Sequence, residues 1–153
     1  MPVYLVQHGK CLAKEEDPQK GLSTEGRKQV SRIAEVAAGY SVRVAIVAHS
    51  GKKRARQTAE IMAEALKPTD GLCEISGIGP MDDVKLISGA ILPGDNRMLV
   101  GHLPFMEKLI AYLVTGREEL TVFRIQNGGI VCLDRDADQS LWHIKWALMP
   151  EIP

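Results

Sequence analysis

The stretch VYLVQHG, residues 3–9, decides the fold of this chain, because an apolar run ends in Gln7, His8 and Gly9. Short apolar runs bounded by glycine are typical of strands buried on both faces, as in parallel sheets. In open α/β sheets, ligands bind beyond the carboxyl ends of the strands. The histidine is therefore expected to face a substrate.

Two stretches downstream repeat this arrangement. Residues 98–100, MLV, lead into GHLP at 101–104, and residues 44–48, VAIVA, lead into HSGKKR at 49–54. Three expected strand ends therefore offer imidazoles together with a cluster of cations.

Strand and helix patterns alternate nearly from end to end, which is typical of an α/β fold. The pattern predicts a three-layer α/β/α sandwich with a mostly parallel central sheet, formed by a single domain over residues 1–153. The last two strands are expected to form a hairpin, and the charged residues 14–21 an exposed loop. Strands are expected at 3–6, 42–48, 72–75, 98–100, 129–133 and 141–146, and helices at 23–39, 50–68, 83–91 and 104–116.

Capping residues mark the expected helix ends. Ser23 or Thr24 can cap the first helix, and Ser50 can cap the second. Pro104 suits a first helical turn, and Gly116 suits the position after a last turn.

Composition excludes several classes of protein. The 19 lysines and arginines equal the 19 aspartates and glutamates in number, so the formal net charge is zero. No net positive charge therefore favours binding to nucleic acid or to an anionic membrane. No apolar run approaches the roughly 18 residues that a membrane span needs, and the first strand is too short for a signal peptide. We expect a cytoplasmic protein. Cys11, Cys73 and Cys132 lack the paired spacing of a zinc site and are interpreted as reduced thiols.

The strand-end residues suit phosphoryl chemistry. A neutral imidazole is a nucleophile near pH 7, so His8 could accept a phosphoryl group. Lys52, Lys53, Arg54 and Arg56 lie at an expected helix start, where the helix dipole disfavours each positive charge by about 0.3 to 1 kcal/mol. A bound anion would offset that cost, and arginine offers a bidentate fork to phosphate oxygens. Arg54 is the residue expected in this role.

The other lysines, arginines and histidines of these stretches can also be interpreted as purely structural. Lysine and arginine at a helix start often form a solvated face, and a strand-end histidine often has only a structural role. We interpret His49 and His143 as structural, because neither has a matching glycine context.

Four motifs in order resemble the histidine phosphatase superfamily, specifically its short, SixA-like phosphohistidine phosphatase branch. They are Gln7, His8 and Gly9 for the family's opening Arg-His-Gly; LSTEG at 22–26; Ser50 with Arg54, Ala55, Gln57 and Thr58; and GHLP at 101–104. The resemblance runs almost end to end and implies a phosphoglycerate mutase-like fold.

The resemblance also implies a role for each residue of the site. His8 would attack phosphorus and carry the phosphoryl group, while Arg54 and His102 hold its oxygens and water then hydrolyses phospho-His8. Gln7, Gly9 and Leu103 would complete the phosphate-binding set. No metal or other cofactor is implied, since cationic side chains replace it. The implied partner is a protein carrying phosphohistidine or a small phosphorylated substrate.

Two departures from the family's pattern leave alternatives open. Gln7 stands where the family has a phosphate-binding arginine, so a charge-assisted bond is lost; Lys10, Lys20 or Lys52 could compensate. No general acid can be assigned between Glu74 and Asp83, which suits an imidazole leaving group. The chain is thus a phosphohistidine phosphatase, a small-metabolite phosphatase, or an impaired member that binds phosphate or a phosphoprotein without turnover.

Overall fold

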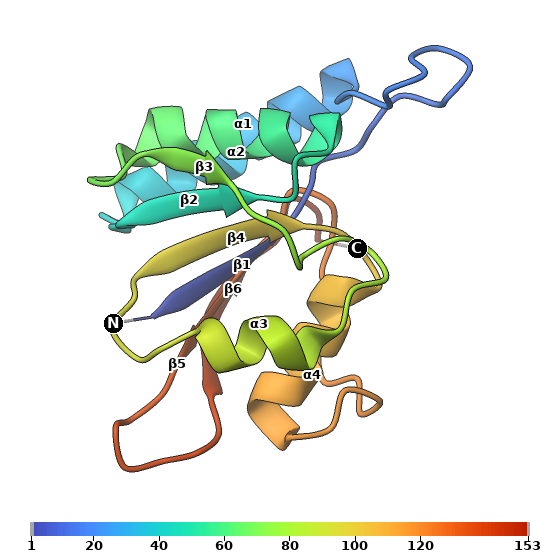
Figure 1. Ribbon diagram of the computed structural model, residues 1–153. Helices are drawn as coiled ribbons and strands as arrows, with labels where there is room; N and C mark the ends of the chain where they lie inside the picture. The colour runs from blue at the N-terminus through green and yellow to red at the C-terminus, as the bar shows by residue number, and fades with distance from the viewer. Residues whose placement is uncertain (1, 153) are drawn as a thin grey trace.

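The computed structural model describes residues 2–152 and confirms the three-layer α/β/α sandwich. A six-stranded sheet in the order β3-β2-β4-β1-β5-β6 forms the middle layer. Helices α1 and α2 cover one face and α3 and α4 the other (Figure 1). The strands are β1 (Val3–Gln7), β2 (Ile46–His49), β3 (Leu72–Glu74), β4 (Arg97–Gly101), β5 (Ile130–Asp134) and β6 (His143–Leu148), and the helices are α1 (Thr24–Gly39), α2 (Lys53–Leu66), α3 (Val84–Ala90) and α4 (Phe105–Thr115).

Strands β1, β2, β3 and β4 run parallel, so their carboxyl ends meet at one edge of the sheet. Strand β1 pairs with β4 in the register Gln7 to Gly101, and β2 pairs with β4 in the register His49 to Val100. Strand β5 pairs antiparallel with β1, and β5 and β6 form the expected hairpin. The segments after β1, β2 and β4 are therefore neighbours in space.

Strand β1 is buried over its whole length, because helices cover both faces of the sheet. Leu5 packs into the core under α3 and α4, whereas Tyr4 and Val6 pack into the core under α1 and α2. This explains why the run from Val3 to Val6 is continuously apolar rather than alternating. Its burial fixes the position of the segment that follows.

Most of the expected helix ends are confirmed. Ser23 caps α1, since its hydroxyl accepts a hydrogen bond from the Gly26 N–H at 3.0 Å. Asp83 caps α3, and Gly116 ends α4 at a φ of 79°. Pro104 is the residue before the first turn of α4 rather than part of that turn.

Two expectations for the segment around β2 were wrong. The strand begins at Ile46 rather than near Val42, because the Val42 N–H instead donates to the Ala37 carbonyl oxygen and closes the end of α1. The residue preceding α2 is Lys52, which makes no side-chain capping bond. Ser50 is therefore not the cap, and its hydroxyl contacts a histidine instead.

None of the helices in the part of the chain that the structure describes is long and apolar enough to cross a membrane. The three cysteines are unpaired.

Gly26 sets how closely α1 approaches the segment after β1. A Cβ at this position would overlap the carbonyl oxygen of Lys10, whereas a Cβ at Gly39 in the same helix would meet nothing within 4 Å. We expect Gly26→Ala to lower the free energy of unfolding by about 1 to 3 kcal/mol, because backbone atoms must move apart.

Urea unfolding of both variants provides the test. Gly39→Ala is the matched control, and it should be neutral or stabilising by about 0.5 to 1 kcal/mol through its helix propensity. Equal effects of the two substitutions would contradict the packing argument.

Candidate functional site

His8 follows β1 directly and is held by the backbone on both sides. Its N–H donates to the Gly101 carbonyl oxygen at 3.0 Å, which extends the parallel ladder between β1 and β4 by one residue. Its carbonyl oxygen accepts from the Asn127 side-chain amide at 2.9 Å and from the Gly128 N–H at 3.2 Å. These bonds fix the backbone from which the imidazole projects.

The hydrogen bonds of the His8 ring determine its tautomer. Nδ1 lies 2.7 Å from the Gly9 carbonyl oxygen, which can only accept, so Nδ1 carries the proton. Nε2 lies 3.3 Å from Arg54 Nε, which can only donate. Both contacts indicate that Nε2 is the unprotonated ring nitrogen and carries the lone pair. The site therefore presents a neutral imidazole whose nucleophilic nitrogen faces a guanidinium.

Gly9 serves packing and orientation. A Cβ there would lie 2.7 Å from Val30 Cγ2, so a larger residue would push α1 away. Its N–H donates to the Thr58 hydroxyl at 3.0 Å, and that hydroxyl donates to the Arg54 carbonyl oxygen at 2.8 Å. The glycine N–H that we expected to bind phosphate is thus occupied in this structure. The same bonds link the His8 segment to the first turns of α2.

His102 follows β4 and lies beside His8. The two ring centroids are 5.1 Å apart, at an interplanar angle of 53°. Its Nε2 is 2.6 Å from Ser50 Oγ, and its Nδ1 is buried without a partner among the described residues. Segments after β1, β2 and β4, together with α2, therefore bring His8, Arg54 and His102 together, as expected from the sequence.

Burial keeps both imidazoles neutral. The pKa of His8 is lowered to about 4, mainly by burial and to a smaller extent by the charges of Arg54 and Lys20, while the bond to the Gly9 carbonyl acts in the opposite direction. Burial likewise lowers the pKa of His102 to about 3, with added contributions from His8, Arg54 and Lys52. The environment is thus short of negative charge, and a bound anion would supply it.

Gln7 is almost fully buried, and its Oε1 has no hydrogen-bond partner among the residues that the structure describes. Leu103, the last expected member of the phosphate-binding set, is 40% exposed. Neither residue brings charge to the site. Arg54 is accordingly the cation in direct contact with His8.

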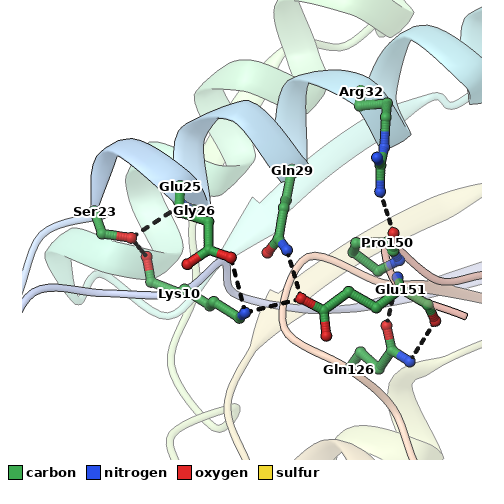
Figure 2. A network of polar contacts seen from close by, with 9 residues as sticks. All are labelled: Lys10, Ser23, Glu25, Gly26, Gln29, Arg32, Gln126, Pro150 and Glu151. Atoms are coloured by element: carbon green, nitrogen blue, oxygen red, sulfur yellow. Dashed lines mark hydrogen bonds and ion pairs between the residues drawn. The ribbon is translucent and has the colours of Figure 1, made fainter. Parts of the chain in front are cut away.

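Lys10 follows Gly9 but is engaged elsewhere. Its ammonium forms ion pairs with Glu25 at 3.2 Å and Glu151 at 3.0 Å. Figure 2 shows this network, in which Glu151 also accepts from Gln29, and Gln126 bonds the Glu151 backbone. The network ties the C-terminal segment to α1 rather than to the histidines.

Several contacts were not expected from the sequence. Ser50 was expected to cap a helix, and Asn127 belongs to none of the four motifs. Glu74 ends β3, and a Cβ on Gly51 would lie 2.5 Å from its carboxylate oxygen, so this acid packs on the loop that carries Ser50. His49 Nδ1 accepts from the Gly51 N–H at 3.1 Å, a contact that suits the structural interpretation.

A cavity away from the histidines is an alternative candidate site. It has a volume of about 410 Å³ and is lined by Tyr40, Val42, Trp146 and Leu148. The described residues of its lining are largely apolar and include no histidine, cysteine or carboxylate. The histidines at the sheet edge are therefore the stronger candidate site.

We expect His8 and His102 to remain neutral at pH 5. Carbon-13 NMR titration of the imidazoles, assigned with His8→Asn and His102→Asn, should give midpoints near 4 and 3. Each folded pKa lies below the value of about 6.5 for an unfolded histidine. The unfolded chain therefore binds more protons in this range, and the free energy of unfolding should fall as pH drops from about 6.5 toward 4. A midpoint near 6.5 for His8 would contradict its burial.

Comparisons with known proteins agree with this geometry. The family model of the histidine phosphatase superfamily (branch 1) matches residues 3–82, just over half of the chain. The stretch that it matches includes His8 and Arg54. No curated relative matches the sequence.

Solved structures share the fold at low sequence identity. The protein histidine phosphatase SixA complexed with tungstate has a TM-score of 0.83 at 23% identity, covering 98% of this chain and 97% of that one. A structure from Agrobacterium tumefaciens assigned as SixA has a TM-score of 0.79 at 24% identity, covering 98% of both chains. A mycobacterial glucosyl-3-phosphoglycerate phosphatase has 0.70 at 14%, covering 95% and 97%. These likenesses confirm the phosphoglycerate mutase-like fold, and the match over residues 3–82 shows that the chain belongs to the histidine phosphatase superfamily.

Proposed function

We propose that this chain is a metal-independent phosphatase that removes the phosphoryl group from phosphohistidine on a cytoplasmic signalling protein. The observation that carries the proposal is the His8 ring. Its Nδ1 proton is held by the Gly9 carbonyl, and its Nε2 lone pair faces Arg54. A neutral nucleophile, fixed in one tautomer beside a guanidinium, suits in-line transfer of a phosphoryl group.

The reaction would proceed in two displacements. In the first, His8 Nε2 forms a bond to phosphorus, and the bond from phosphorus to the substrate nitrogen breaks with its electron pair going to that nitrogen. The other nitrogen of the substrate ring carries a proton taken from solvent, so the leaving group departs as neutral imidazole. In the second, water attacks phospho-His8, the bond between phosphorus and Nε2 breaks, and inorganic phosphate leaves. Arg54 would turn its donors from Nε2 to the phosphoryl oxygens as charge develops on them.

His102 would assist by holding a phosphoryl oxygen. The ring lies 5.1 Å from that of His8, and its buried Nδ1 has no partner in the described part of the chain. Ser50 Oγ, at 2.6 Å from Nε2, would orient the ring. A dianion in the site would also raise the pKa of His102 and favour a proton on both nitrogens.

The leaving group favours phosphohistidine as the substrate. Imidazole has a conjugate-acid pKa near 6.5, so breaking its bond to phosphorus needs far less help from an acid than breaking a sugar phosphate ester does. The segment between α2 and β4 is short, and α3 within it packs against α4 on the sheet face. This leaves little chain to cover a small metabolite and suits a protein substrate.

Trapping the intermediate tests the proposal. Wild-type protein mixed with a phosphohistidine protein or phosphoramidate and quenched at alkaline pH should carry acid-labile phosphate on His8 by mass spectrometry. His8→Ala should carry none and should lose turnover, and EDTA should leave the wild-type rate unchanged. Turnover that survives in His8→Ala would rule out the mechanism.

The Gln7→Arg variant tests whether the wild-type protein is a slow phosphatase or has lost catalysis. Restoring the charge-assisted bond should raise turnover by about one to two orders of magnitude, for about 1.4 to 2.8 kcal/mol of transition-state stabilisation. Tight phosphate binding by the wild type without phosphoryl transfer would instead identify an impaired, phosphate-binding member.

Glu74 favours a second candidate function, hydrolysis of a small phosphate monoester. Its carboxylate packs against Gly51, next to the serine that contacts His102, and it could protonate an alkoxide leaving group. One structural neighbour is the glucosyl-3-phosphoglycerate phosphatase.

We expect Glu74→Gln to leave phosphoramidate turnover within about twofold, because the imidazole or amine leaving group needs little acid help. Parallel steady-state assays with a sugar phosphate decide between the two functions. A loss of about 100-fold or more, confined to the ester, would favour the metabolite phosphatase.

A further inference from the structure

Within residues 2–152, the site offers a single contacting cation to a phosphoryl dianion. Gln7 is 3% exposed, and its amide brings no charge to the end of β1. Arg54 is the cation in contact with His8. A phosphoryl dianion taken from water into this buried place needs more than one cation around it. A second cation close to His8 would have to supply the charge that Gln7 lacks.

Most cations near α2 and the His8 segment are already paired. Lys10 is held by two glutamates, and Lys53 forms an ion pair with Asp17 at 2.8 Å. Arg56 contacts Glu60 at 3.7 Å. Among the described residues, Lys20 has no ion-pair partner, although it belongs to the same loop as Asp17.

The backbone at Lys20 is held in an unusual conformation. Its φ is 53°, a left-handed value that favours glycine and that few lysines adopt. Its N–H donates to the Asp17 carbonyl oxygen at 2.8 Å, and the next N–H, that of Gly21, donates to the Asp17 carboxylate at 2.9 Å. These bonds hold the Lys20 backbone in place, so its side chain projects from a fixed point of the loop.

The loop that carries Lys20 is anchored to α2. Asp17 pairs with Lys53 in the first turn of that helix, and the Leu22 N–H donates to Gln57 Oε1 at 2.7 Å in the next turn. A Cβ on Gly21 would lie 2.8 Å from Lys53 Cε and 3.1 Å from Gln57 Oε1. The backbone at Lys20 therefore lies next to the first two turns of α2, and Arg54 is in the first of them.

The electrostatics of His8 agree with this placement. The positive charge of Lys20 lowers the pKa of His8, in the same direction as the charge of Arg54. The ammonium thus acts on the nucleophile itself. Lys52, which also has no ion-pair partner among the described residues, acts on His102 instead, and it lies two residues from Ser50, which contacts that ring.

We propose that Lys20 binds the phosphoryl oxygens of the substrate in this chain and supplies the positive charge that Gln7 lacks. The ligand is a phosphoryl dianion held between the Lys20 ammonium and the Arg54 guanidinium. This inference rests on the proposed function, because it assigns a residue to the same phosphate site. It requires binding of phosphate, but not its turnover.

Calorimetric titration with inorganic phosphate tests the inference without reliance on catalysis. Lys20→Met should weaken phosphate binding by about tenfold or more, as expected for loss of a bond to a charged group. Lys20→Arg should retain most of the affinity. Lys14→Met, an exposed lysine earlier in the same loop, is the matched control and should bind like the wild type.

Lys20→Gly separates a role in binding from a role in folding. Glycine relieves the left-handed backbone, so the melting temperature should stay equal or rise while phosphate affinity falls as in Lys20→Met. The double variant Gln7→Arg, Lys20→Met should recover affinity, since an arginine at position 7 restores the charge.

The outcomes distinguish this inference from the proposed function. Phosphate binding that depends on Lys20 in a protein without turnover would support the inference and overturn the phosphatase. Turnover through His8 with wild-type phosphate affinity in Lys20→Met would overturn the inference alone. A wild-type protein that binds no phosphate at millimolar concentration would overturn both.

Discussion

The parallel pairing of β1, β2 and β4 is the constraint on which the site depends. Parallel strands end at the same edge of a sheet, so residues separated by roughly 50 positions in the sequence become neighbours there. The hydrogen bond from the His8 N–H to the Gly101 carbonyl oxygen continues the ladder one residue beyond the strands. It thereby sets the distance between the two imidazoles.

Burial and charge act together at this edge. The layers of helices remove water from both rings, which lowers the pKa of His8 and of His102 and keeps His8 a nucleophile rather than a cation. Arg54 lies at a helix start, where the helix dipole adds to its positive field. The positive field of Arg54 near the two neutral imidazoles attracts an anion, and this favours phosphate as the group bound.

Rigid support of His8 comes from positions outside the four sequence motifs as well as within them. Asn127 and Gly128 hold the His8 carbonyl oxygen, and Thr58 joins Gly9 to α2. The C-terminal network around Glu151 occupies Lys10 and keeps that cation out of the site. Where each cation is paired, rather than how many the sequence contains, decides which of them can meet a substrate.

The sequence by itself determined the layers of the fold, the helix ends at Ser23 and Gly116, and the family, because apolar periodicity and short motifs are local properties. It also indicated His8, Arg54 and His102, since each follows directly on an expected strand or begins a helix. Only the tertiary structure decided that Ser50 contacts His102 instead of capping α2, and that Lys10 is paired while Lys20 is not. Those contacts join residues far apart in the chain, and a hydroxyl or an ammonium takes whichever partner the packing of strands and helices brings within reach.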